Sequence, residues 1–122
     1  MKAANEETLR FIASSFRSIW ALELLLVLKN ENRPCSHEEL VTTMRASDLV
    51  VAKALDALES AALVSCDGGS AQYTPVNAEV AGLVERTEAL YAKRPDAVRR
   101  AIVSTSASDA AAFANAFRLR KD

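Results

Sequence analysis

Apolar residues recur at helical spacing along most of the chain. We predict a first helix capped by Asn5, because the apolar residues that follow recur every three or four positions, as on one helix face: Leu9, Ile12, Ala13 and Phe16. Residues 19–28 are apolar almost all round, which is typical of a helix that is buried on several sides. Residues 30–34 end this second helix.

A pair of short helices is predicted next. Ser36 and Glu39 form the S-x-x-E pattern of a capping box, in which each residue satisfies a free amide of the other, and it starts a short helix. Residues 45–47 form the turn, and Ser47 caps the following helix. That helix carries one predicted buried face: Val51, Ala54, Leu55, Leu58 and Ala62. Two helices joined by so short a turn indicate a helix-turn-helix.

A hairpin and further helices complete the pattern. Residues 63–66 and 71–74 are predicted strands, with the turn at residues 67–70. Asn77 is placed to cap a helix that runs to about Lys93, and Pro95 suits the first position of another. The apolar residues of these helices are Val80, Leu83, Val84 and Leu90, then Val98, Ala101 and Ile102. A last helix is expected after residues 104–108, with Ala110, Phe113, Ala114 and Phe117 as its apolar stripe.

Residues 18–75 resemble the winged helix domains of bacterial transcription regulators, including those of the multiple-antibiotic-resistance type. The residues that carry the resemblance are VAKALDALESAALV at 51–64, DGG at 67–69 and YTP at 73–75. At Ala62, many relatives of this class have a helix-ending glycine. The expected fold is mainly α with a small β-hairpin: a winged helix-turn-helix with additional N- and C-terminal helices. We expect a single domain over residues 1–122, with an N-terminal helix at 1–17, the core at 18–76 and C-terminal helices at 77–122.

Bulk properties restrict the possible functions. The net charge is −1, with 15 basic and 16 acidic residues, so no overall field attracts nucleic acid or an acidic membrane. The longest apolar stretch, residues 19–28, is about half the length needed to span a bilayer and begins too deep for a secretion signal. Two cysteines and one histidine are too few for a usual structural zinc site. We expect a cytoplasmic protein without a membrane span, metal or cofactor.

In the regulators that this chain resembles, the helix at residues 47–62 enters the major groove and the hairpin touches the flanking backbone. At 100° per residue, the face opposite the buried stripe carries Leu49, Lys53, Asp56 and Ser60, flanked by Val50, Ala52 and Ala57. Across residues 36–64, two basic residues stand against five acidic ones, a net charge of −3. Such a surface is poorly equipped to hold phosphates. Leu49 and Val50 suit an apolar protein contact, unless they pack on the preceding helix or on the hairpin.

Basic residues gather instead near the C-terminus. Residues 93–121 hold seven basic and two acidic side chains, a net charge of +5. Six of them are candidates to contact phosphates or an acidic partner: Arg94, Arg99, Arg100, Arg118, Arg120 and Lys121. The alternative is an ordinary solvated helix face.

The terminal helices carry apolar stripes that a small core is not expected to bury completely. These stripes contain Leu9, Ile12 and Phe16 in the first helix, and Phe113 and Phe117 in the last. A homodimer through the terminal helices would cover them, and a two-fold interface is the commonest assembly of small proteins. The competing interpretation is intramolecular packing of both ends on residues 19–28.

Enzymatic chemistry is not expected, because the chain has no phosphate-cradling, nucleophile-elbow or zinc-protease motif. His37 lies near Cys35 and Glu38, but neighbours at the start of a helix do not form a nucleophile, base and orienting group. Two interpretations of Cys35 and Cys66 stand: they form a redox switch, or they are small side chains without a shared role. Trp20 and Tyr91 are expected in the core or an interface rather than in a ligand cage.

Two functional hypotheses follow, and the first is placed slightly ahead. The first is a transcription regulator that binds duplex DNA as a dimer, with Arg45 near a phosphate and these residues facing the groove: Ser47, Leu49, Ala52, Lys53 and Asp56. The second is a winged-helix protein-interaction module with little or no DNA affinity, which uses the same face, including Val50, against a protein partner.

Overall fold

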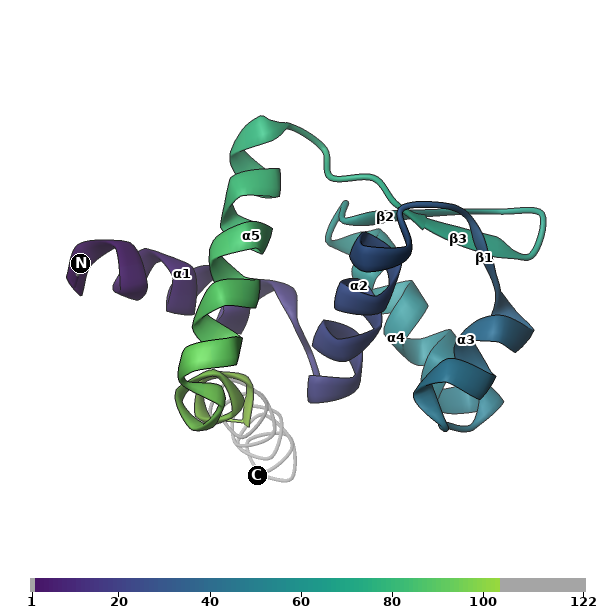
Figure 1. Ribbon diagram of the computed structural model, residues 1–122, viewed down its shortest axis with the longest axis horizontal. Coiled ribbons are helices and arrows are strands. Elements are labelled where there is room, and N and C mark those ends of the chain that lie inside the picture. Colours follow the sequence, from purple (N-terminus) through teal and green to yellow (C-terminus); the bar gives the residue numbers. More distant parts are fainter. Residues whose placement is uncertain (1, 104–122) are drawn as a thin grey trace, which may run out of the picture.

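The computed structural model describes residues 2–103. This part of the chain is mainly helical, with a small three-stranded antiparallel sheet (Figure 1). In chain order the elements are α1 (Lys2–Ser15), α2 (Ile19–Glu31), β1 (Cys35–Ser36), α3 (His37–Met44), α4 (Asp48–Ser60), β2 (Val64–Asp67), β3 (Ser70–Tyr73) and α5 (Ala78–Lys93). A further helix follows at residues 95–103, beginning at Pro95 as predicted.

Helix α2 forms the centre of the described molecule, with α5 on one side of it and α3 and α4 on the other (Figure 1). Its buried residues are Ala21, Leu22, Leu24, Leu25 and Leu28, which confirms the prediction of a helix covered on several sides. The Ser18 hydroxyl accepts a hydrogen bond from the Ala21 amide at 3.3 Å and caps the first turn. Asn32 ends the helix in the left-handed region.

The sequence signals for α3 and α4 are confirmed in detail. The Glu39 amide donates to the Ser36 hydroxyl and the Ser36 amide donates to the Glu39 carboxylate, both at 3.1 Å, so the capping box is complete. Residues 45–47 join the two helices, and the Ser47 hydroxyl accepts from the Val50 amide at 3.2 Å. The short, doubly capped connection holds α4 against both α2 and α3.

The predicted hairpin is present, and it belongs to a larger sheet in the order β1-β3-β2. Gly68 and Gly69 connect β2 to β3 with φ values of 57° and 83°, the two positive angles of a type I′ turn. Strand β1 was not predicted from the sequence. It consists of only Cys35 and Ser36, which pair with Ala71 and Ser70. Two residues carry no alternating pattern, so only the partner strand makes this segment recognisable as β structure.

Two predictions about helix ends are wrong. Helix α1 begins at Lys2, and Asn5 lies inside it rather than capping it, because the preceding Lys-Ala-Ala residues are good helix formers. Ala62 is exposed and lies beyond the end of α4, not on its buried face. Its φ is 61°, and the amides of Ala62 and Leu63 donate to the carbonyls of Glu59 and Leu58. These are the bonds of a Schellman motif, in which the left-handed position favours glycine.

Helix α1 lies against α5, and its apolar side belongs to the core of the same chain. Ile12 and Phe16 are almost completely buried, and Leu9 packs at the edge of the core. The apolar stripe of α1 is therefore buried within the same chain. It packs mainly against α5, whereas the competing interpretation placed it on α2. Phe113 and Phe117 lie outside the described residues. A dimer through the terminal helices stays a prediction, no longer supported by an uncovered stripe on α1.

Helix α5 packs on the core partly through polar contacts. The Asn77 side chain accepts from the Val80 amide at 2.9 Å, which confirms the predicted cap. Val84 and Leu90 of the predicted stripe are buried, whereas Val80 and Leu83 are partly exposed. Two side-chain hydrogen bonds join α5 to α2, from Lys29 to Glu88 at 2.8 Å and from Tyr91 to Glu23 at 2.6 Å.

Within residues 2–103, no single helix is long and apolar enough to cross a membrane. Residues from α1 and α2 pass that test only when taken together, and the two segments are bent by 106° at their junction. Val98 and Ile102 in the helix at residues 95–103 are buried in the core, as their spacing predicts.

Candidate interaction surface around helix α4

The structure divides α4 into the two faces that the sequence predicts. Val51, Ala54, Leu55 and Leu58 are buried. The candidate site residues Arg45, Ser47, Lys53 and Asp56 are exposed, and Val50 and Ala52 are half-buried. Leu49 is 62% exposed, so the interpretation that it packs on α3 or on the hairpin is wrong. An apolar side chain therefore stands in solvent at the start of the outward face of α4.

A hollow of about 340 Å³ is lined by residues at the start of α2 and in the middle of α4. We call it the α4 hollow, and its lining residues are Arg17, Ser18, Trp20, Val50, Lys53, Ala54 and Ala57. Trp20 is 42% exposed beside it. Val50 of α4 and Trp20 of α2 thus line the same hollow. The sequence placed Val50 near the outward face but gave no sign that Trp20 would line that hollow, because their spacing of 30 residues belongs to two helices.

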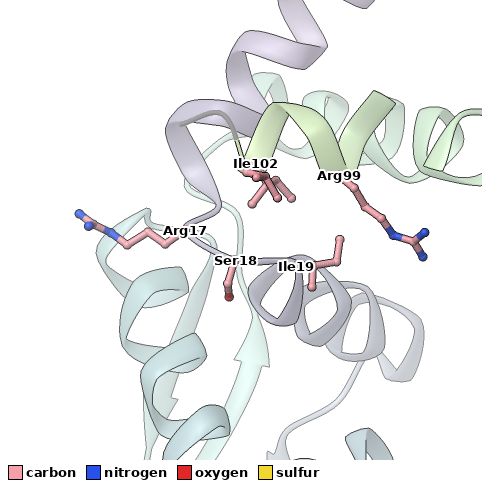
Figure 2. Close-up of a pocket in the computed structure, with 6 residues that line it drawn as sticks. Arg17, Ser18, Ile19, Arg99 and Ile102 are labelled. Carbon is pink, nitrogen blue, oxygen red and sulfur yellow. The ribbon is translucent and has the colours of Figure 1, made fainter. Parts of the chain in front are cut away.

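A second hollow of about 320 Å³ lies on the other side of the α2 N-terminus, against the helix at residues 95–103. We call it the α2 hollow, and it is lined by Arg17, Ser18, Ile19, Arg99, Ile102 and Val103. Ile19 and Ile102 approach each other across it, whereas Arg17 and Arg99 point away to opposite sides (Figure 2). Val103 is 65% exposed. Because Arg17 and Ser18 line both hollows, the two are neighbours.

The surface of α3, α4 and the hairpin tip is acidic. Its exposed acidic residues are Glu38, Glu39, Asp48, Asp56, Glu59 and Asp67. Arg33 binds Glu39 at 2.8 Å and Glu31 at 2.9 Å, and His37 lies 3.2 Å from Asp48. The hydrogen bonds from Arg33 and from the Ser36 amide lower the pKa of Glu39 from 4.5 to about 2, so this carboxylate stays charged. The acidic character predicted from the sequence is therefore exposed on the folded surface.

The candidate basic residues do not form one patch in the described structure. Arg99 lines the α2 hollow, lies 5.9 Å from the Tyr91 ring centre and contacts Asp96 at 3.9 Å. Arg94 lines a depression between α1 and α5, and Arg100 is exposed on the helix at residues 95–103. Arg118, Arg120 and Lys121 lie outside the described residues.

The register of the sheet shows whether Cys35 and Cys66 can form a disulfide. Cys35 and Cys66 both pair with Ala71, from opposite sides of β3. Two strand spacings place their Cα atoms roughly 9.5 Å apart, beyond the reach of a disulfide. Burial raises the pKa of both thiols, which weakens their reactivity. A disulfide between these cysteines within one folded chain is therefore excluded by geometry.

The cluster of Cys35, His37 and Glu38 does not converge. His37 pairs with Asp48 on α4, and the Cys35 thiol donates to the Arg33 carbonyl at 3.5 Å. Within the part of the chain that the structure describes, no group of three His, Cys, Asp or Glu side chains is placed to hold a metal ion.

Comparisons with known proteins give no further constraint: no family model, no curated protein sequence and no solved structure matches this chain. The resemblance to winged helix regulators stays a prediction from the sequence. The function must be inferred from the geometry and charge of the molecule.

Proposed function

We propose that this chain is a winged helix-turn-helix domain that binds a protein partner through the outward face of α4. The element order supports the fold: a buried helix, a short strand, two helices joined by three residues, and a two-stranded ribbon with a glycine tip. The resemblance leads to the same expectation for residues 18–75. The outward face of α4 then corresponds to the surface by which such domains contact their targets.

The observation that carries the proposal is the exposed apolar surface at the outward face of α4 and in the hollow between that helix and α2. Leu49 stands in solvent at one end of α4, and farther along Trp20 borders the hollow lined by Val50, Ala54 and Ala57. Apolar side chains rimmed by polar ones are typical of protein interfaces, and tryptophan is enriched at their energetic centres. A partner that covers these residues would gain apolar burial from both α4 and α2.

Charge favours a protein over DNA as the partner of the single chain. On the described residues of α3, α4 and the ribbon, Arg45 and Lys53 are the basic side chains against six exposed acidic ones. Neutralisation of phosphates supplies nearly all non-specific affinity for DNA and much of the specific affinity. A protein surface needs no such charge.

Site-specific photo-crosslinking in the native host tests this proposal. A photoreactive residue replaces Leu49, and a matched control replaces Glu85, which is exposed on α5. We expect one protein to be crosslinked from position 49 and not from position 85, with a yield that nuclease treatment does not change. The proposal fails if position 49 yields no more protein than position 85, or if its product is nucleic acid.

A second candidate function is duplex DNA binding by a dimer. It is favoured by the exposure of Arg45 and Ser47 in the turn before α4 and of Lys53 within that helix. A recognition helix would meet the groove there, with Leu49, Ala52 and Asp56 beside these residues. Anisotropy titration of mixed duplexes should then show affinity that falls steeply with salt and falls further in Lys53→Glu. Undetectable binding at low salt would eliminate this candidate.

A further inference from the structure

The α4 hollow and the α2 hollow form a paired hollow that meets at Arg17 and Ser18. Three segments far apart in sequence contribute its walls: the start of α2, the middle of α4 and the end of the helix at residues 95–103. The central wall is Ser18 with Ile19 and Trp20 on either side. Apolar side chains line both hollows, Ile102 and Val103 in one and Trp20 and Val50 in the other, and the polar residues Arg17 and Ser18 lie where the two meet.

The charged side chains that line the paired hollow are all basic. Arg17, Lys53 and Arg99 line it, and no acidic side chain among the described residues does. Asp96 and the Tyr91 ring contact Arg99 from its own side of the hollow. This arrangement contrasts with the acidic surface of α3 and the ribbon. A ligand that fits must present an apolar stripe and carry negative charge beside it.

Deepening the proposed function and resting on it, we propose that the paired hollow binds an acidic amphipathic helical segment of the partner protein. Two neighbouring hollows with apolar walls, of about 320 and 340 Å³, would each receive apolar side chains from one face of a helix, with acidic residues beside that face meeting Lys53 and Arg99. A compact small molecule would fill only one of them. Duplex DNA would leave the apolar walls uncovered.

A designed peptide provides the first test. The probe has about 16 residues, with leucine at i, i+3, i+4 and i+7 and glutamate on its other faces, and its control carries lysine in place of glutamate. Trp20 is the only tryptophan of the chain, so its fluorescence reports directly on the α4 hollow. We expect the acidic peptide to shift the Trp20 emission to shorter wavelength at low salt, and the basic peptide to leave it unchanged.

Matched variants of the full chain locate the binding. Arg99→Glu should lower the affinity for the acidic peptide about fivefold, and Lys53→Glu should lower it by a similar factor. Arg100 lies on the same helix as Arg99 but outside the hollow, so Arg100→Glu should change this affinity less than about twofold. Val103→Asp should lower the affinity for the acidic peptide about tenfold. Val76→Asp, equally exposed at 63% in the segment before α5, is its control. Thermal melts of each variant verify folding.

The outcomes separate this inference from the proposed function. Equal binding of both peptides, or equal effects of the hollow variants and their controls, overturns the inference, even if position 49 crosslinks to a protein. Loss of self-association in Val103→Asp, measured by sedimentation, would assign the hollow to a second copy and also overturn it. Duplex DNA that protects Trp20 and depends on Arg99 more than the peptide does would overturn it in favour of DNA.

Discussion

Residues 19–73 and the helices that flank them are held in place by different means. In the first region, α2, α3 and α4 each begin at a serine cap, and backbone hydrogen bonds join the three strands. The flanking region consists of α1, α5 and the helix at residues 95–103. It attaches through a smaller set of buried apolar residues and through two side-chain pairs, Lys29–Glu88 and Tyr91–Glu23.

This difference indicates where the chain is rigid and where it is adjustable. Within the first region, α4 packs directly on α2, and the capped connections between successive elements are short. The flanking helices depend on side chains that meet across long sequence separations. The paired hollow lies between the two regions, since Val50 and Lys53 belong to the first and Ile102 and Val103 to the second. Its shape therefore depends on how tightly the flanking helices are held.

The largest expected effect is a cavity in the centre of the first region. Leu25→Ala should lower the free energy of unfolding by about 3 kcal/mol, because a fully buried leucine leaves an unfilled space. Ile12→Val, at an equally buried site in α1, should cost about 1 kcal/mol. Urea titrations followed by circular dichroism measure both. Because both residues belong to one core cluster, each variant should show one transition. Two transitions would mean that the regions unfold separately.

A glycine at the end of α4 should make the first region more stable. Ala62→Gly removes the penalty of a Cβ atom at φ 61° in the Schellman motif, and should raise the free energy of unfolding by about 0.5–1 kcal/mol. Thermal melting measures the shift. Ala52→Gly, within α4, should lower the free energy of unfolding by a similar amount. If both variants lower the melting temperature, the left-handed position at Ala62 is wrong.

The polar contacts between α5 and α2 should contribute less to the free energy of unfolding than the features above. Lys29 and Glu88 form a half-buried pair at 2.8 Å, and its hydrogen bond raises the pKa of Lys29. A double-mutant cycle of Lys29→Met and Glu88→Gln should give a coupling energy of about 0.5 kcal/mol. The raised pKa means that this contribution is present at neutral pH and is lost as the pH rises through the value in the folded protein. A coupling energy of zero would mean that the attachment of α5 to α2 depends on apolar contacts and the Tyr91–Glu23 hydrogen bond.

The smallest expected effect concerns acid stability around Glu39. Its pKa of about 2 in the folded chain lies below its ordinary value of 4.5, so its contribution is complete above pH 4.5 and is lost as the pH falls towards 2. Glu39→Gln should therefore be less stable than the natural chain at pH 7. The difference should disappear near pH 2. A difference in urea midpoint that does not change over this range would contradict the Arg33–Glu39 contact.

Much of the first region was predictable because its signals are local. Ser36, Glu39 and Ser47 act within one helical turn, and Gly68 and Gly69 form a turn on their own. The flanking region was less predictable. The start of α1 was misplaced, and the packing of α1 on α5 could not be read from either helix alone. Leu49 was correctly assigned to the outward face, but its exposure of 62% depended on what α3 and the ribbon leave uncovered.

The sequence by itself determined the helices, the glycine turn and the two faces of α4, because each is set by residues within a few positions of one another. Only the tertiary structure decided that Cys35 joins the sheet, that β3 separates it from Cys66, and that Trp20 and Val50 line the same hollow. The physical reason is the same in each case. These relations join residues whose separation in the chain carries no pattern, and only the packing of α2 between its neighbours brings them together.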